Sequence, residues 1–288
     1  MNDFVITTDS GCDLSGEYLG KLGVEVCRIS YMLGEEKVPD PMEEDFTRSF
    51  YQLMREGKTP KTSQLNTYEL YEFWKAFMPR DILHISLGSG ISGTYNNALA
   101  AKDMLQEEYP DVRVIVIDSL LASVGYGMLA ITASRMKESG AGIEEIAEKL
   151  EDEKHHINTW YTTGDLTYLY RSGRVSRVGA AVGTMLHINP ILNLDDQGKL
   201  IVRNRVRGKK AAVRAIYEAV SALCEAPETQ TLYICHSDVP EEAKELGEGL
   251  KNEFGFKDVF YTYIGPSIGA HCGPGLMAAF FEGKPRTR

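Results

Sequence analysis

Apolar and polar residues follow two different periods along this chain. Short apolar runs, typical of strands buried in a sheet, occupy residues 4–10, 24–33, 82–87 and 112–119. In other segments apolar residues recur every three or four positions, which predicts helices at 43–57, within 61–79, and at 94–109, 125–140 and 143–157. The first helix has Phe46, Phe50, Leu53 and Met54 on one face, and Gly57 marks its end.

The order of these elements predicts an α/β fold of two lobes. Strands that alternate with helices predict a parallel sheet covered on both faces, so we expect residues 1–157 to form a parallel-sheet α/β lobe. Residues 158–288 predict a mixed α+β lobe. Its elements are a strand at 158–166, helix, loop and helix over 166–187, a hairpin turning at 196–198, helices at 209–224 and 241–254, and strands at 231–237 and, last, 259–265.

Composition matches an ordinary globular protein, with 43% hydrophobic and 25% charged residues among 288. The first fifteen residues carry acids where a secretory signal needs bases, and no apolar run approaches the roughly 20 residues of a membrane span. We therefore expect a cytoplasmic protein without stable membrane insertion. Five scattered cysteines without C-x-x-C spacing, and the lack of an H-E-x-x-H pattern, give no sequence support for a metal site.

Charge is distributed unevenly along the chain. The net charge of −10 argues against a nucleic-acid partner. Between Arg171 and Arg214, however, ten basic residues stand against two acidic ones. This segment is either a solvated basic face or a docking surface for an anionic ligand or an acidic protein.

A glycine-rich turn follows the strand at 82–87. Gly88, Gly90 and Gly93 have the G-x-G-x-x-G spacing of a dinucleotide site, and Asp118 ends the next strand, where such a site needs an acid. A nucleotide-dependent enzyme is therefore one hypothesis. Against it, the turn holds more hydroxyls than a phosphate cradle requires, and it lies on a middle strand of the lobe rather than the first.

Hydroxyl side chains collect where the predicted strands end. Ligands of open α/β sheets bind outside the carboxyl ends of the strands, so we expect Thr62 and Ser92 to face one crevice. His271 lies in a glycine-rich stretch and is a candidate ligand contact. A further hypothesis is an acyl hydrolase with Ser92 as nucleophile and His271 as base, although no G-x-S-x-G motif surrounds Ser92.

Seven short motifs in the same order along the chain resemble the DegV family, whose members with known roles are fatty acid-binding subunits of bacterial fatty acid kinase. The chain departs from the family at Gly88, where members commonly have a serine before Ser89, and at Leu65, where proline usually follows the TSQ motif. The first departure makes the dinucleotide spacing accidental. The motifs are "ITTDSGCDLS", "KTSQ", "ISLGSGISGTYNNA", "IDSLLASVGYG", "LTYLYRSGRVS", "INPILNLDDQGKL" and "GAHCGPG".

The resemblance implies a carrier that encloses a long-chain fatty acid between its two lobes and is not itself an enzyme. Residues matching Thr62 and Ser92, with the backbone near Gly93, hold the carboxylate in the family, and those matching Arg205 and His271 lie near it. Burying a methylene contributes about 0.8 kcal/mol, so a chain of about sixteen carbons gains on the order of 10 kcal/mol before ordering costs. The carboxylate, in contrast, needs hydrogen-bond donors.

The resemblance also implies a partner. A separate kinase phosphorylates the bound acid with ATP to an acyl phosphate, which serves phospholipid metabolism. Arg174 matches a surface implicated in meeting that kinase, and we group Arg171 and Arg177 with it. The expected ligand is the fatty acid, with no other cofactor and no metal.

Overall fold

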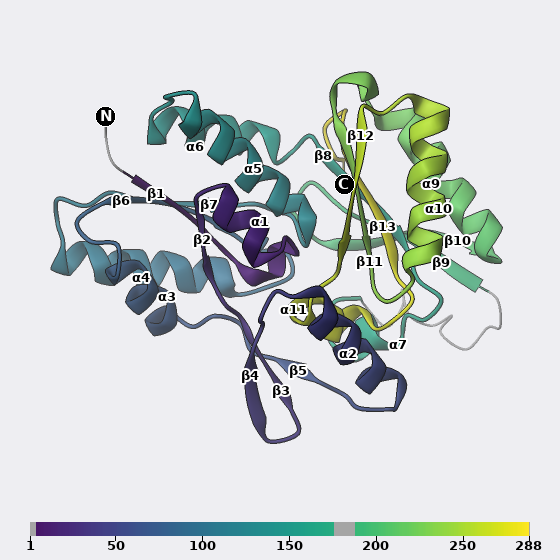
Figure 1. Ribbon diagram of the computed structural model, residues 1–288, viewed down its shortest axis with the longest axis horizontal. Coiled ribbons are helices and arrows are strands. Elements are labelled where there is room, and N and C mark those ends of the chain that lie inside the picture. The colour runs from purple at the N-terminus through teal and green to yellow at the C-terminus, as the bar shows by residue number, and fades with distance from the viewer. Residues whose placement is uncertain (1–3, 176–187, 288) are drawn as a thin grey trace.

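The computed structural model describes residues 4–175 and 188–287, which contain three β-sheets (Figure 1). The first is the predicted parallel sheet, with four strands in the order β2-β1-β6-β7. Its strands are β1 (Phe4–Asp9), β2 (Val24–Cys27), β6 (Asp81–Ser86) and β7 (Val114–Asp118).

Helices cover both faces of the parallel sheet, as the alternating pattern predicts. Figure 1 shows α5 (Val124–Glu138) and α6 (Ile143–Glu153) on one side and α3 (Thr67–Lys75) and α4 (Thr94–Glu108) on the other. Adjacent residues of β6 serve the two layers: Leu83 packs in one core with Leu129 of α5, and Ile82 in another with Trp74 of α3. The short α1 (Gly16–Lys21) and the 3-10 turn η1 (Ser10–Cys12) connect β1 to β2.

The second sheet is mixed and has six strands in the order β10-β9-β8-β13-β11-β12. Only β11 and β12 pair in parallel among its described strands. Its strands are β8 (Ile157–Thr162), β9 (Ile188–Leu194), β10 (Leu200–Arg207), β11 (Thr231–His236), β12 (Asp258–Tyr263) and β13 (Met277–Glu282). The predicted hairpin is confirmed, because β9 and β10 pair antiparallel around 196–198.

The two faces of the second sheet have different partners. Helices α9 (Lys209–Leu223) and α10 (Pro240–Phe254) cover its outer face, where Phe281 packs with Ile216 and Leu246. The neighbouring Phe280 points the opposite way and belongs to the core that contains Leu83 and Leu129. The inner face therefore packs against the parallel-sheet layer. The short η2 (Pro227–Thr229) precedes β11.

A third, smaller sheet was not predicted. It has the order β4-β3-β5 and consists of β3 (Ser30–Leu33), β4 (Glu36–Pro39) and β5 (Lys61–Thr62). The single strand expected at 24–33 is wrong, because the chain leaves the parallel sheet after Cys27. The backbone N–H of Ile29 donates to Ser10 Oγ at 3.0 Å and its carbonyl accepts from Asp40, so this residue cannot extend the ladder. Helix α2 (Glu44–Arg55) packs on this sheet through Phe50.

Two further elements differ from the sequence prediction. The expected last strand, now β12, is followed by β13, and the glycine-rich stretch between them forms the helix α11 (Pro266–Cys272). Of the helix, loop and helix predicted over 166–187, the first helix is α7 (Thr167–Arg171), and residues 176–187 lie outside the described residues. The lobe boundary at residue 157 stays a prediction. No helix in residues 4–175 and 188–287 is long and apolar enough to cross a membrane.

Candidate functional site

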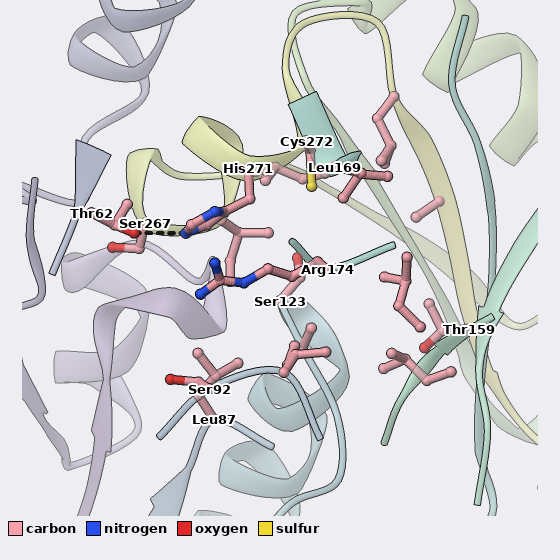
Figure 2. Close-up of a pocket in the computed structure, with 18 of the residues that line it drawn as sticks. Thr62, Leu87, Ser92, Ser123, Thr159, Leu169, Arg174, Ser267, His271 and Cys272 are labelled. Carbon is pink, nitrogen blue, oxygen red and sulfur yellow. Dashed lines mark hydrogen bonds between the residues drawn. The ribbon is translucent and has the colours of Figure 1, made fainter. Parts of the chain in front are cut away.

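A narrow pocket lies between the parallel sheet and the inner face of the second sheet (Figure 2). It holds about 890 Å³ between its walls, counting its open mouth, but only about 100 Å³ is wide enough for the centre of a water molecule. Its apolar wall consists of Ile29, Leu87, Ile91, Ala122, Leu169, Leu194, Leu200, Ile264, Ile268, Leu276, Ala278 and Phe280.

One polar end of the pocket is built from two distant parts of the chain. Thr62, at the end of β5, and His271, in the last turn of α11, lie with Thr62 Oγ1 and His271 Nε2 2.6 Å apart. Burial lowers the pKa of His271 to about 4, and the positive charge of Arg174 adds to this. The imidazole is therefore neutral near pH 7, with one nitrogen donating and the other accepting.

Arg174 enters the same end of the pocket. Its guanidinium lies near His271 and Thr62 in Figure 2, although part of the residue stays exposed to solvent. Burial lowers the pKa of the guanidinium, but at pH 7 the group remains positively charged. The residue expected on a docking surface is thus also a pocket residue, and it brings a cation to the polar end.

Ser92 lines the pocket from the turn that precedes α4. Its Oγ accepts from the backbone N–H of Thr94 at 3.2 Å and lies 3.0 Å from Thr94 Oγ1. The backbone N–H of Gly93 donates to Gln64 Oε1 at 3.1 Å, which ties this turn to the loop after Thr62. The structure therefore brings Thr62, Ser92 and His271 to one pocket, while the Gly93 amide already has a partner. Their role as ligands stays a prediction.

The other candidate residues lie elsewhere. Arg205 is exposed on β10 and does not line the described part of the pocket. Arg171 is exposed at the end of α7. Arg177 lies outside the described residues.

The glycines of the dinucleotide pattern have a packing role. A Cβ on Gly88 would lie 2.7 Å from the backbone nitrogen of Leu121, and one on Gly90 would lie 2.4 Å from the carbonyl carbon of Gly198. The Asp118 carboxylate accepts from the backbone N–H groups of Ser89 and Leu120. At Gly88 and Gly90 the space that a side chain would fill is occupied by neighbouring backbone and not by a pyrophosphate. The carboxylate of Asp118 holds the turn in place through its two hydrogen bonds.

The hydrolase hypothesis also lacks its geometry. A nucleophile and its base need to lie within hydrogen-bond reach. His271 bonds Thr62 and Ser92 bonds Thr94, and no hydrogen bond joins Ser92 to His271. In residues 4–175 and 188–287 no group of three or more His, Cys, Asp or Glu side chains is arranged to hold a metal ion.

Sequence reasoning missed the hydroxyls Ser123 and Ser267, which also line the pocket. Each donates to a buried carboxylate behind the wall, Ser123 Oγ to Asp13 and Ser267 Oγ to Asp40 at 3.3 Å. Burial raises the pKa of Asp40 to about 6 and that of Asp13 well above its usual range. The spacing of Ser267 and His271, four residues apart on one helix face, was the available signal.

Comparison with known proteins identifies similar chains. A family model described as "Uncharacterised protein, DegV family" matches residues 3–284. A DegV domain-containing protein of Clostridium perfringens is 34% identical over 286 residues, 98% of each chain. The solved structure of DegV from Bacillus subtilis, described as a fatty acid binding protein, has a TM-score of 0.85 at 26% identity and covers 99% of this chain and 100% of that one. The Fatty Acid Kinase (Fak) B3 protein of Streptococcus pneumoniae, solved with linoleic acid, shares the fold, with a TM-score of 0.84 at 19% identity over 98% and 99% of the two chains.

Proposed function

The chain belongs to the DegV family, and from this premise we propose that it binds a long-chain fatty acid in the pocket between its two large sheets. The observation that carries the proposal is the division of the pocket into a long apolar wall and one end that holds Thr62, His271 and Arg174. A fatty acid has the same division, with an apolar chain and a single anionic group. The Bacillus subtilis protein of this fold is described as a fatty acid binding protein, which supports the same conclusion.

The polar end supplies what a buried carboxylate requires. Arg174 provides a positive charge, and Thr62 and Ser92 provide hydroxyls that rotate toward an oxygen. In the tautomer that carries its proton on Nε2, the neutral His271 donates to Thr62 Oγ1 at 2.6 Å and leaves the Thr62 hydroxyl hydrogen free to be donated to the carboxylate. In this proposal the carboxylate binds at this end and the chain extends along the apolar wall, which supplies most of the affinity at about 0.8 kcal/mol per buried methylene.

The proposal includes a division of labour with a second protein. In this proposal the chain holds the acid and a separate kinase phosphorylates it. Arg174 is partly exposed, so the carboxylate would lie near the surface, where a kinase can reach it. Arg171 and Arg177, close to Arg174 in the sequence, would form the docking surface for that kinase. This carrier would act in the cytoplasm, where a kinase finds ATP.

Mass spectrometry of organic extracts tests the proposal. Protein purified from a host that makes long-chain fatty acids should release such an acid in near-stoichiometric amount. A protein sample unfolded in denaturant, washed and refolded should take up added octadecanoic acid to the same ratio. Absence of any long-chain acid in repeated preparations, together with no uptake by the refolded protein, would refute it.

A further inference from the structure

Two polar side chains lie in the apolar part of the pocket without partners. Thr159 and Tyr161 both line it, and their exposed fractions are only 4% and 5%. Within residues 4–175 and 188–287, neither Thr159 Oγ1 nor the Tyr161 hydroxyl has a hydrogen-bond partner. Buried hydroxyls in folded proteins are normally paired, so these two need an explanation.

The strand geometry places both residues on the same face. They are two positions apart on β8, and side chains at this spacing point the same way. In the antiparallel ladder Thr159 lies opposite Phe280 and Tyr161 opposite Ala278, which both line the pocket. The intervening Trp160 belongs to the core on the other face of the sheet.

Thr159 lies away from the polar end already described. Figure 2 shows Thr159 on the opposite side of the pocket from Thr62 and His271. Leu194 and Leu200 line the pocket from the neighbouring β9 and β10. A plain hydrocarbon chain offers no hydrogen bond here, and an unpaired buried hydroxyl disfavours the bound state by about tenfold or more.

We propose that Thr159 and Tyr161 form a second polar subsite that binds a hydroxyl group on the chain of a fatty acid. This inference rests on the proposed function and narrows its ligand class to include hydroxylated fatty acids. A Tyr hydroxyl donates well, and a Thr hydroxyl both donates and accepts. A secondary alcohol on the ligand both donates and accepts, so it supplies the missing hydrogen-bond partner to whichever of the two hydroxyls it lies beside.

Binding of a positional series of acids tests the subsite. The protein freed of lipid is titrated with octadecanoic acid and with octadecanoic acids that carry one hydroxyl at successive chain positions. Because the carboxylate fixes the register of the chain, affinity should peak at one position or two adjacent positions. The peak should exceed the affinity for acids hydroxylated elsewhere by about tenfold or more.

Variants assign the preference to these side chains. Thr159→Val and Tyr161→Phe remove one hydroxyl each with little change in shape, and each should lower the peak, with the double variant abolishing it. Thr162→Val is the matched control, because Thr162 lies on the same strand with its Oγ1 bonded to the Pro190 carbonyl at 2.9 Å on the other face. It should leave the positional profile unchanged even if it lowers stability.

The outcomes separate this inference from the function on which it rests. If no acid of the series binds, the proposed function fails and the subsite fails with it. If octadecanoic acid binds but every hydroxylated acid binds more weakly, without a positional peak, only the subsite is overturned and the two hydroxyls hold water. A peak that persists in the double variant also overturns the assignment. The dependence of affinity on hydroxyl position is measured on the unaltered protein. The test therefore decides the matter even if a variant fails to fold.

Discussion

Thr62 and His271 stand 209 positions apart in the sequence, yet Thr62 Oγ1 and His271 Nε2 lie 2.6 Å apart at the polar end of the pocket. One residue ends a two-residue strand of the small third sheet, and the other lies in a helix between two strands of the mixed sheet. The pair therefore forms only when the third sheet and the mixed sheet are assembled. The pair supplies an oriented hydroxyl beside the positive charge of Arg174.

Removing the Thr62 hydroxyl should weaken fatty acid binding. Thr62→Val keeps the shape of the side chain but takes away a hydrogen bond to a charged group, so we expect a loss of about 10-fold to 100-fold in affinity. Competition against a fluorescent fatty acid measures this loss. Thr62→Ser, which retains the hydroxyl, is the control and should bind nearly as well as the unaltered protein. Equal affinity for all three proteins would remove Thr62 from the head-group site.

Substitutions at Arg174 and Arg171 should have different effects: the first on fatty acid affinity, the second on the interaction with the kinase. Arg174→Gln removes the cation of the polar end and should lower fatty acid affinity by about tenfold. Arg171→Gln changes an exposed residue at the end of α7 and should leave that affinity unchanged. In a coupled assay with the kinase, Arg171→Gln should instead slow acyl phosphate formation. Loss of fatty acid affinity in Arg171→Gln would contradict the assignment of ligand binding to Arg174 and of kinase docking to Arg171.

The charge of Arg174 should also be visible at His271. Burial holds the pKa of His271 at about 4, and Arg174 is the second cause. In lipid-free Arg174→Gln the pKa of His271 should rise toward its ordinary value, while burial keeps it below that value. Proton NMR titration of the imidazole measures the change. A pKa that does not move would show that the guanidinium is not near His271 in solution.

Ionisation of Asp40 should lower the free energy of unfolding as pH rises. Burial raises its folded pKa to about 6 from 3.8, so between these values the folded chain holds more protons than the unfolded chain. Stability contributed by the protonated carboxyl is present below pH 3.8 and is lost by the time pH has risen through 6. Asp40→Asn cannot ionise and should be more stable at pH 8 by up to about 3 kcal/mol, the equivalent of about two pKa units.

Denaturant unfolding at two pH values checks the Asp40 prediction. The advantage of Asp40→Asn at pH 8 should disappear near pH 3, where the carboxyl is protonated in both states. Asp103→Asn, which removes an exposed carboxylate on α4, is the control for the loss of a surface charge. An advantage that is the same at both pH values would assign the effect to packing, not to ionisation.

The glycines of the turn should act on stability. A Cβ at Gly90 would lie 2.4 Å from the backbone of Gly198, so Gly90→Ala should destabilise the fold by about 1–3 kcal/mol. Gly20 lies inside α1, where a Cβ would meet nothing within 4 Å, and Gly20→Ala should stabilise by about 0.5–1 kcal/mol. Thermal unfolding compares the two. If Gly90→Ala leaves the thermal stability unchanged but abolishes binding of a dinucleotide by the protein, the dinucleotide hypothesis would be restored.

The parallel sheet was predictable because its signal is local. The runs at 4–10, 82–87 and 112–119 are strands with helices between them, and buried parallel strands have few polar interruptions. The strand at 24–33 was mispredicted for a non-local reason. Its break depends on a bond from Ile29 to Ser10 and another from Asp40, neither of which a hydropathy pattern records.

The sequence allowed us to predict which hydroxyl residues line the site, but not which side chains contact one another there. Strand ends pointed to Thr62 and Ser92, and both line the pocket. Glycine density hid α11, so the relation of Ser267 to His271 on one helix face was missed. Thr159 and Tyr161 gave no signal, because threonine and tyrosine are ordinary strand residues and only their lack of partners in three dimensions distinguishes them.

A crystal structure of the protein loaded with a fatty acid brominated on its last carbon tests the central claim most directly. The account predicts a carboxylate within hydrogen-bond distance of Thr62 Oγ1 and Ser92 Oγ, beside Arg174, and a bromine peak in the apolar part of the pocket between the two large sheets. A chain bound in the reverse direction, a carboxylate that contacts neither hydroxyl, or a pocket that stays empty at saturating acid would contradict it.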